Sequence, residues 1–264
     1  PMATQPATAW TEAQPVGAVL IIAAWNYPIQ LALAPMVAAL SAGCTIALKP
    51  SELAPATSAL LAELIPRHVD RDAVTVVEGA VGVTTELLTL PWDHILFTGS
   101  THVGRIVMEA AAKNLTPVTL ELGGKSPNII FEDASIDQAI EGIISGIYFN
   151  QGHVCCAGSR LFVQESVLDE VIRRLEWRMK SLRVGDPLDK NTDVGAINSK
   201  QQLATINRYL KIGCEEGAEV HVPAGGEVPA DCHGRSLRPI LEGGEPPADW
   251  PRDAFCEFHG SHMG

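Results

Sequence analysis

Residues Ala13 to Leu48 contain no charged side chain, and this stretch limits the possible folds more than any other feature of the chain. It is longer than a membrane-spanning helix requires. However, Pro28, Pro35 and Gly43 interrupt it, and proline and glycine break a continuous helix. Its first part, Val16–Ala23, is short and rich in β-branched residues, like a strand that is buried on both faces of a sheet. We therefore expect a buried α/β core here and no membrane span.

Strand-like apolar segments alternate with helical segments over residues 1–122. Alternation of this kind predicts parallel βαβ units with helices on both faces of one sheet, a Rossmann-like doubly wound domain. The expected strands are Val16–Ala23, Thr45–Leu48, Val74–Val77, His94–Thr98 and Pro117–Leu122, and the expected helices are Leu31–Ala42, Ala56–Ile65 (stopped by Pro66), a short one including Glu86–Leu88, and Val103–Lys113.

A second alternating run predicts a second α/β lobe over residues 123–222, with a hinge near Gly123-Gly124. Residues 223–264 are rich in glycine, proline and acidic residues, and we expect a loop-like, partly disordered tail there. The expected strands are Asn128–Phe131, Leu161–Val163 and Glu219–Val222, and the expected helices run from the caps Asp133 and Ser135 to Asn150, from Ser166 to Gly185, and through Leu203, Ile206 and Leu210 to about Gly213.

The charge and cysteine content exclude several classes of function. The net charge of −12 disfavours nucleic acid and anionic membranes as partners, because binding to phosphate groups needs a basic surface. The six cysteines have no framework spacing, which favours reduced thiols in a cytoplasmic protein. No CxxC pair suggests zinc, so we expect no metal site. No secretory signal is visible, since the first basic residue is Lys49.

Two adjacent cysteines, Cys155 and Cys156, lie in a glycine-rich segment after a helical run. A substrate can approach a thiol closely in such a place, and a thiolate is a strong nucleophile. The alternative is that both cysteines pack in the core as small apolar residues. Upstream, Glu121 is an isolated carboxylate between Leu120 and Leu122, which is either exposed at a strand end or held there for a purpose.

Further polar residues follow the predicted strands of the first domain. Gly99 and Ser100 form a strand-to-helix turn whose backbone N–H groups and helix dipole favour an anion, although such turns are also common without a ligand. Lys49 and Glu52 follow a buried strand at its carboxyl end, where open α/β sheets bind ligands. A solvated lysine and a helix-capping glutamate would explain them equally well. Asn26 is either a turn residue or a buried amide that needs partners.

Five motifs occur together in one order: WNYP from Trp25, KPSE from Lys49, FTGST from Phe97, ELGGKSP from Glu121 and GHVCCAG from Gly152. This set resembles the NAD(P)-dependent aldehyde dehydrogenase superfamily, and residues 12–127 are most similar to its class 3 branch. The resemblance covers about residues 15–223. It amounts to roughly half of a typical member, so we expect family segments to be missing at both ends.

The resemblance implies a role for each candidate residue. Cys155, three residues after the motif glycine, would be the nucleophile; Glu121 would be the general base, and Asn26 would stabilise an oxyanion together with the backbone N–H of Cys155. The implied cofactor-binding residues are Lys49 and Glu52 on the adenosine ribose, Gly99 and Ser100 on the pyrophosphate, and also Trp25 and Gly104. The cofactor would be NAD, with NADP possible.

The implied reaction is the oxidation of a small aldehyde to a carboxylic acid through a cysteine thiohemiacetal and thioester. Glu121 favours hydrolysis of the thioester, since relatives that pass it to coenzyme A generally lack this acid. His153 replaces the usual glutamine beside the cysteines. Family members are commonly homo-oligomers, and the class 3 resemblance suggests medium-chain or aromatic aldehydes. The alternative is an inactive fragment or paralogue that serves as a nucleotide-binding or subunit-assembly module.

Overall fold

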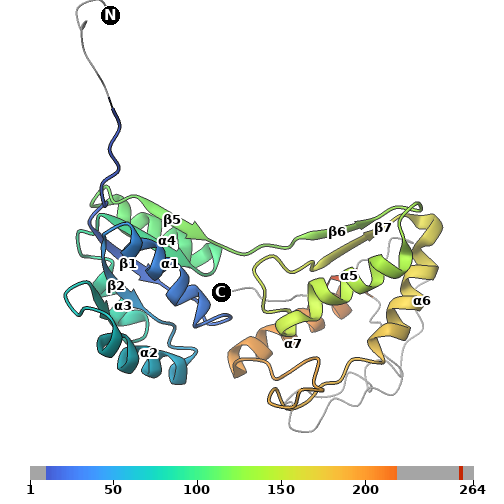
Figure 1. The fold of residues 1–264 in the computed structure, drawn as a ribbon. Helices are drawn as coiled ribbons and strands as arrows, with labels where there is room; N and C mark the ends of the chain where they lie inside the picture. The colour runs from blue at the N-terminus through green and yellow to red at the C-terminus, as the bar shows by residue number, and fades with distance from the viewer. Residues whose placement is uncertain (1–9, 219–255, 258–264) are drawn as a thin grey trace, which may run out of the picture. The chain divides into compact units, whose positions relative to one another are not determined.

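The computed structural model describes residues 10–218 and 256–257. The chain divides into two compact units, Pro1–Glu121 and Leu122–Gly264 (Figure 1). Both units combine helices with a largely parallel sheet, as the alternating pattern predicts.

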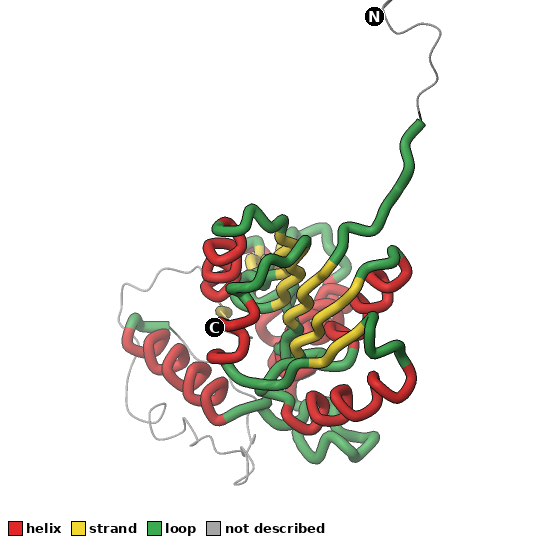
Figure 2. Tube along the Cα trace, turned by 90° about the vertical axis from the view of Figure 1, so that its left-hand side faces the viewer, coloured by secondary structure: helices red, strands yellow, loops and turns green. Residues whose placement is uncertain are grey.

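The first unit contains a five-stranded sheet in the order β3-β2-β1-β4-β5, and every neighbouring pair is parallel. Figure 2 shows these strands side by side, with helices next to them. The strands are β1 (Ala18–Ile22), β2 (Thr45–Lys49), β3 (Val74–Val76), β4 (His94–Thr98) and β5 (Val118–Glu121), and the helices are α1 (Gln30–Ser41), α2 (Pro55–His68), α3 (Val81–Leu87) and α4 (Thr101–Ala112). The predicted doubly wound fold is therefore confirmed.

The strand order places a topological switch point between β1 and β4. The chain moves from β1 to β2 and β3 on one side, then returns to add β4 and β5 on the other. Since parallel crossovers are right-handed, α1 and α2 cover one face and α3 and α4 cover the other. Met36 and Leu61 pack with the β-strand residues of the first face, and Val107 of α4 is buried on the second. Open sheets of this kind bind ligands at the switch point, outside the carboxyl ends of the strands.

The uncharged stretch forms the centre of this sheet. Leu20, Ile21 and Leu48 have no exposed surface, and they lie on the two neighbouring strands β1 and β2. Among the described residues, no helix has the length and apolar character that crossing a membrane requires.

The prediction that Pro66 stops the second helix is wrong. Pro66 lies inside α2, which continues to His68. Proline lacks its own N–H but leaves the later donors intact, and the Val69 N–H still donates to the Ile65 carbonyl at 2.9 Å. A proline this close to the end removes one hydrogen bond without ending the final turn.

The second unit is built on two parallel strands, β6 (Pro127–Ile130) and β7 (Arg160–Val163), joined through α5 (Ile136–Tyr148). A two-residue strand, β8 (Cys256–Glu257), pairs antiparallel with β7, so this part of the predicted loop-like tail is strand. The helices α6 (Leu168–Met179) and α7 (Lys200–Glu215) follow, with short 3-10 turns at Phe149–Gly152 and Glu165–Val167. The predicted strand Glu219–Val222 and the rest of the tail lie outside the described residues.

The isoleucines of α5 face the core of the second unit as predicted. Ile140, Ile143, Ile144 and Ile147 are buried against Val171, Leu175 and Met179 of α6, and Ile136 is partly buried beside them. Ser135 occupies the N-cap position, but its side chain makes no capping hydrogen bond.

Two predicted helix ends in the second unit are wrong. The helix α5 ends at Tyr148 instead of Asn150, because Asn150 has a positive φ of 49° that a right-handed helix cannot contain. The helix α6 ends at Met179, well before Gly185. Here the Ser181 hydroxyl donates to the Arg178 carbonyl at 2.7 Å, which satisfies a carbonyl at the end of the helix.

Candidate active site

The switch point of the first unit carries one predicted site residue after each central strand. Asn26 follows β1 in the turn that leads to α1, and only 9% of its surface is exposed. Trp25, beside it, is half-buried. Ser100 follows β4 and is also buried, with 8% exposed. The structure thus brings the WNYP and FTGST motifs to the same edge of the sheet, because β1 and β4 are parallel neighbours.

Lys49 and Glu52 form an ion pair at the carboxyl end of β2. The Lys49 Nζ lies 2.6 Å from Glu52 Oε2, and Lys49 is almost fully buried, with 2% exposed. Burial by itself would raise the pKa of Glu52, but the hydrogen bond from Lys49, a backbone hydrogen bond and the positive charge of Lys49 together outweigh it and hold this pKa below its ordinary value. A buried lysine needs such a partner. The alternative interpretation of Lys49 as a solvated side chain is therefore wrong.

The turn after β4 is tightly constrained. A Cβ atom on Gly99 would lie 2.3 Å from the Phe97 ring, so only glycine fits without a shift. The Gly99 N–H donates to the Glu121 carbonyl at 3.0 Å, and Ser100 Oγ accepts from the Val103 N–H at 3.2 Å. The Gly104 N–H donates to the Ser100 carbonyl within α4. The N–H groups of Val103 and Gly104 are therefore already used, and the donors that remain for an anion at this helix start are those of Thr101 and His102.

Glu121 is the last residue of β5 and is exposed. Its backbone pairs with Thr98 in the parallel ladder and accepts from Gly99, so the strand end is held at the carboxyl edge of the sheet. The Glu121 carboxylate is therefore exposed at a strand end.

Cys155 and Cys156 are both exposed in the second unit, so the alternative of core packing is wrong. Partial burial raises the pKa of the Cys155 thiol, and the charge and side chain of Cys156 raise it further. The backbone N–H groups of the two cysteines offset part of this rise by favouring the thiolate. Cys155 is accessible to a substrate, but it needs a base before it can act as a nucleophile at neutral pH.

A left-handed turn leads into the cysteines. Asn150, Gln151 and Gly152 have φ values of 49°, 56° and 76°, and for the first two residues this conformation costs about 1–2 kcal/mol each. The Asn150 side chain donates to the His153 carbonyl at 3.3 Å and so holds the turn closed. His153 is buried, and burial lowers its pKa to about 4, so its ring is neutral at physiological pH and cannot activate Cys155 as a cation.

The double glycine of ELGGKSP lies against the cysteine segment within the second unit. The Gly124 N–H donates to the Cys155 carbonyl at 3.2 Å. A Cβ atom on Gly123 would lie 3.7 Å from the same oxygen. These two motifs are far apart in sequence, and from sequence the glycines suggested only a hinge.

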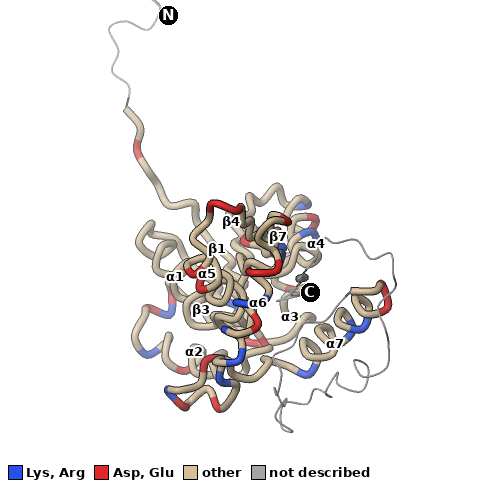
Figure 3. The backbone as a smooth tube through the Cα atoms, turned by 90° about the vertical axis from the view of Figure 1, so that its right-hand side faces the viewer, with Lys and Arg blue, Asp and Glu red and all other residues tan. Residues whose placement is uncertain are grey.

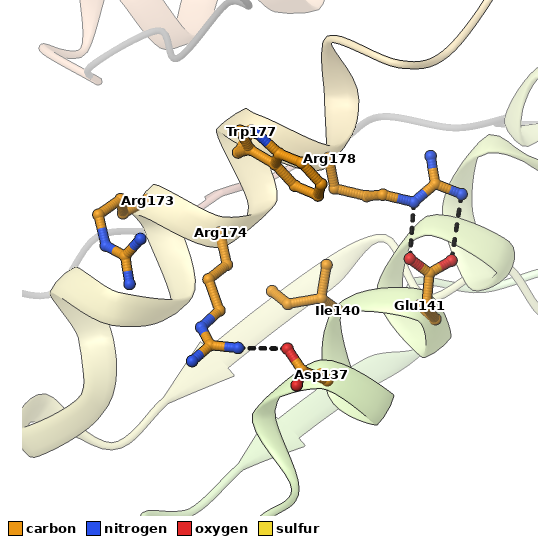
Figure 4. Close-up of a pocket in the computed structure, with 7 residues that line it drawn as sticks. All are labelled: Asp137, Ile140, Glu141, Arg173, Arg174, Trp177 and Arg178. Carbon is orange, nitrogen blue, oxygen red and sulfur yellow. Dashed lines mark hydrogen bonds and ion pairs between the residues drawn. The ribbon is translucent and has the colours of Figure 1, made fainter.

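The open groove between α5 and α6 is a different feature (Figure 4). It has a volume of about 490 Å³ and no nucleophile among its lining residues. Ion pairs of Arg174 with Asp137 and of Arg178 with Glu141 cross it and join the two helices. We assign these charges to helix packing.

One polar pair at the carboxyl edge of the first sheet was missed by the motif search. Ser58 is buried on α2, and its hydroxyl donates to Glu78 Oε1 at 2.9 Å. Glu78 follows β3 just as Lys49 ends β2. The rule that ligands bind beyond the carboxyl ends of strands could have identified Glu78, but nothing in the sequence pointed to Ser58.

Charges of both signs are mixed along the described surface. Figure 3 shows Lys and Arg beside Asp and Glu on α2 and α7. In the part of the chain that the structure describes, no group of three or more His, Cys, Asp or Glu side chains is arranged to hold a metal ion.

The chain belongs to the aldehyde dehydrogenase family, whose family model matches residues 1–247. It is 48% identical over 203 residues to aldehyde dehydrogenase family 3 member A2 of Rattus norvegicus, covering 77% of this chain and 42% of that protein. It is 44% identical to the dimeric NADP-preferring aldehyde dehydrogenase of Mus musculus, covering 77% of this chain and 45% of that one. The resemblance to the class 3 branch is thus confirmed.

Solved structures agree with this assignment. The AldH of Staphylococcus aureus in a substrate-bound state matches with a TM-score of 0.75 and 36% identity, over 84% of this chain and 48% of that one. PnpE in complex with nicotinamide adenine dinucleotide matches with a TM-score of 0.75 and 38% identity, over 79% and 44%. The chain spans less than half the length of these relatives.

Proposed function

We propose that this chain takes part in the oxidation of an aldehyde to a carboxylic acid with NAD(P)+. The first unit would bind the cofactor, and the second would supply the nucleophile Cys155. The observation that carries the proposal is the exposure of Cys155 in a segment whose carbonyl accepts a hydrogen bond from Gly124, because this bond joins the GHVCCAG and ELGGKSP motifs within the second unit.

The polar groups at the carboxyl edge of the first sheet fit a nicotinamide dinucleotide. Lys49 donates hydrogen bonds and Glu52 accepts them, which suits the two hydroxyls of the adenosine ribose. Gly99 and Ser100 would position the pyrophosphate at the start of α4, with Trp25 and Gly104 shaping the site. When bound, the cofactor supplies a hydride acceptor.

In the proposed mechanism the Cys155 sulfur attacks the aldehyde carbon and forms a thiohemiacetal. Because the pKa of Cys155 is raised, a base must take its proton, and we assign this role to Glu121. The Asn26 side-chain amide and the Cys155 backbone N–H would donate to the oxyanion. Loss of hydride leaves a thioester on Cys155. Glu121 then gives the thiol proton to solvent and is a carboxylate again. It removes a proton from water as the water attacks the thioester, and it passes this proton to the departing Cys155 sulfur, which releases the carboxylic acid and restores the thiol.

The second candidate is a nucleotide-binding or subunit-assembly module without turnover. It is favoured by the raised pKa of Cys155, because a thiol with a raised pKa is protonated at neutral pH unless a base acts on it. We further propose a cytoplasmic setting, on the ground that Cys44, Cys155, Cys156 and Cys214 are free thiols, and self-association, since one relative is named dimeric.

A single-turnover experiment tests the proposal. The purified chain is mixed with excess NAD or NADP and a panel of medium-chain and aromatic aldehydes, and reduced nicotinamide is followed by fluorescence. We expect a burst followed by turnover, with the burst lost in Cys155→Ser and retained in the matched control Cys156→Ser. Glu121→Gln should retain a slower burst and lose turnover.

Absence of a burst in the wild-type chain would contradict the oxidation proposal. If NAD still raised the melting temperature, the binding-module function would remain. A burst that survives in Cys155→Ser would contradict the choice of nucleophile.

A further inference from the structure

Glu78 lies at the same edge of the first sheet as the Lys49–Glu52 pair. Strands β2 and β3 are parallel neighbours, and their ladder continues past β3 because the Val77 N–H donates to the Leu48 carbonyl at 2.8 Å. Glu78 is the next residue and is exposed. Two acidic residues therefore follow adjacent strands at the carboxyl edge, where the proposed adenosine ribose would lie.

A hydrogen bond from α2 holds the Glu78 carboxylate at this edge of the sheet. Ser58 has only 6% of its surface exposed and donates to Glu78 Oε1 at 2.9 Å. Ser58 lies in the first turn of α2, and that helix begins directly after the loop that contains Glu52. Gly79 has a φ of 151°, and a Cβ atom there would lie 2.5 Å from the Val83 side chain, so the chain turns away immediately after Glu78.

We propose that Glu78 makes the nucleotide site select dinucleotides with a free ribose 2′-hydroxyl over those with a 2′-phosphate. This inference rests on the proposed function, because it deepens the cofactor specificity of the same site. Glu78 is a specificity-determining residue and takes no part in the chemical steps.

The proposal depends on the charges of three side chains at this edge, those of Lys49, Glu52 and Glu78. Lys49 and Glu52 form an ion pair at 2.6 Å, so their charges balance. The Glu78 carboxylate then adds a negative charge that neither of these two residues balances. A 2′-hydroxyl can donate a hydrogen bond to a carboxylate. A phosphate monoester carries close to two negative charges at neutral pH, so the unbalanced Glu78 carboxylate would repel it. One relative is named NADP-preferring, so membership of the family does not by itself predict whether this chain prefers NAD or NADP.

The test measures binding of NAD and NADP to the full chain by isothermal titration calorimetry at low salt. We expect the wild-type chain to bind NAD more tightly, and Glu78→Gln to tighten NADP binding about threefold to tenfold with little change for NAD. Ser58→Ala should shift the ratio in the same direction by less. The matched control is Glu109→Gln, which removes the same charge from an exposed residue near the far end of α4.

The outcomes separate this inference from the proposed function. If NAD binds and Glu78→Gln leaves the NAD-to-NADP ratio unchanged, the role of Glu78 is wrong while the nucleotide site stands. An equal shift in Glu109→Gln would also overturn it, since a general charge effect would then explain the result. If neither dinucleotide binds to the wild-type chain, the proposed function fails, and the inference fails with it.

Discussion

Helices cover the sheets of the two units to different extents. In the first unit, helices cover both faces of five parallel strands, and residues such as Leu20 and Ile21 on opposite faces are fully buried. In the second unit, α5 and α6 bury one face of β6 and β7, while Ile129 and Phe131 are more than half exposed among the described residues.

This difference fits the roles proposed for the two units. Lys49 and Ser100 are buried polar side chains at the edge of a well-packed sheet, which suits the fixed recognition of a large cofactor. Cys155 is an exposed thiol after a left-handed turn, where a small substrate can approach it. We therefore expect substitutions in the core of the first unit to cost more stability than comparable substitutions in the second.

The largest expected effect comes from the two cores. Leu48→Ala removes a fully buried side chain of the first unit, whereas Leu161→Ala changes a residue with 8% exposure in the second. We expect losses of about 3–5 kcal/mol for Leu48→Ala and about 2–3 kcal/mol for Leu161→Ala in free energy of unfolding. Urea unfolding measures both. An equal loss at the two positions would contradict the comparison of the units.

A smaller effect is expected at the Lys49–Glu52 pair. Glu52→Gln leaves the buried Lys49 ammonium with a neutral partner, and we expect a loss of about 1–3 kcal/mol at pH 7. Because the pKa of Glu52 is lowered in the folded state, its contribution is present above the ordinary value of 4.5 and is lost as the pH falls below it. The difference between wild type and variant should therefore shrink in acid.

Thermal unfolding between pH 7 and pH 3 measures the difference in stability between wild type and Glu52→Gln. The control is Glu63→Gln on α2, which breaks an exposed ion pair with Arg67 and should change stability by less than about 1 kcal/mol. A difference between wild type and Glu52→Gln that grows in acid would show that Lys49 does not stabilise the Glu52 carboxylate.

The smallest effect concerns thiol reactivity in the second unit. Since the pKa of Cys155 is raised, its alkylation by iodoacetamide should be slow at pH 7 and rise about tenfold per pH unit toward alkaline pH. Cys156→Ser removes the neighbouring thiol that raises this pKa, so the alkylation rate of Cys155 near neutral pH should increase severalfold. Peptide mass spectrometry separates the two sites, and a rate independent of pH would contradict the assignment.

The sequence predicted the first unit well because each of its strands is a short apolar run between clear turn residues. The wrong predictions in both units concern helix ends, where a single residue signal competes with hydrogen bonds that the sequence does not show. Pro66 was given more weight than the hydrogen bonds around it, and Ser181, which bonds the Arg178 carbonyl, gave no signal of a helix end. Asn150 adopts a left-handed conformation in a turn that its side chain closes by donating to the His153 carbonyl, and the apolar pattern of the helix did not report this turn.

The site was predictable where a motif lies at a strand end. The Lys49–Glu52 spacing permits an ion pair within one turn, and the structure contains it. Contacts between distant segments were not predictable, as with the hydrogen bond from Gly124 to Cys155 and that from Ser58 to Glu78. Such pairs depend on how the elements pack, and a single sequence does not report this.

The most direct test of the division between the two units is hydrogen exchange of the full chain with and without NAD. The account predicts protection of residues 23–27, 49–54 and 98–104 at the carboxyl edge of the first sheet, with no protection of β6 and β7. Protection confined to the second unit, or none at saturating NAD, would contradict the assignment of the cofactor site to the first unit.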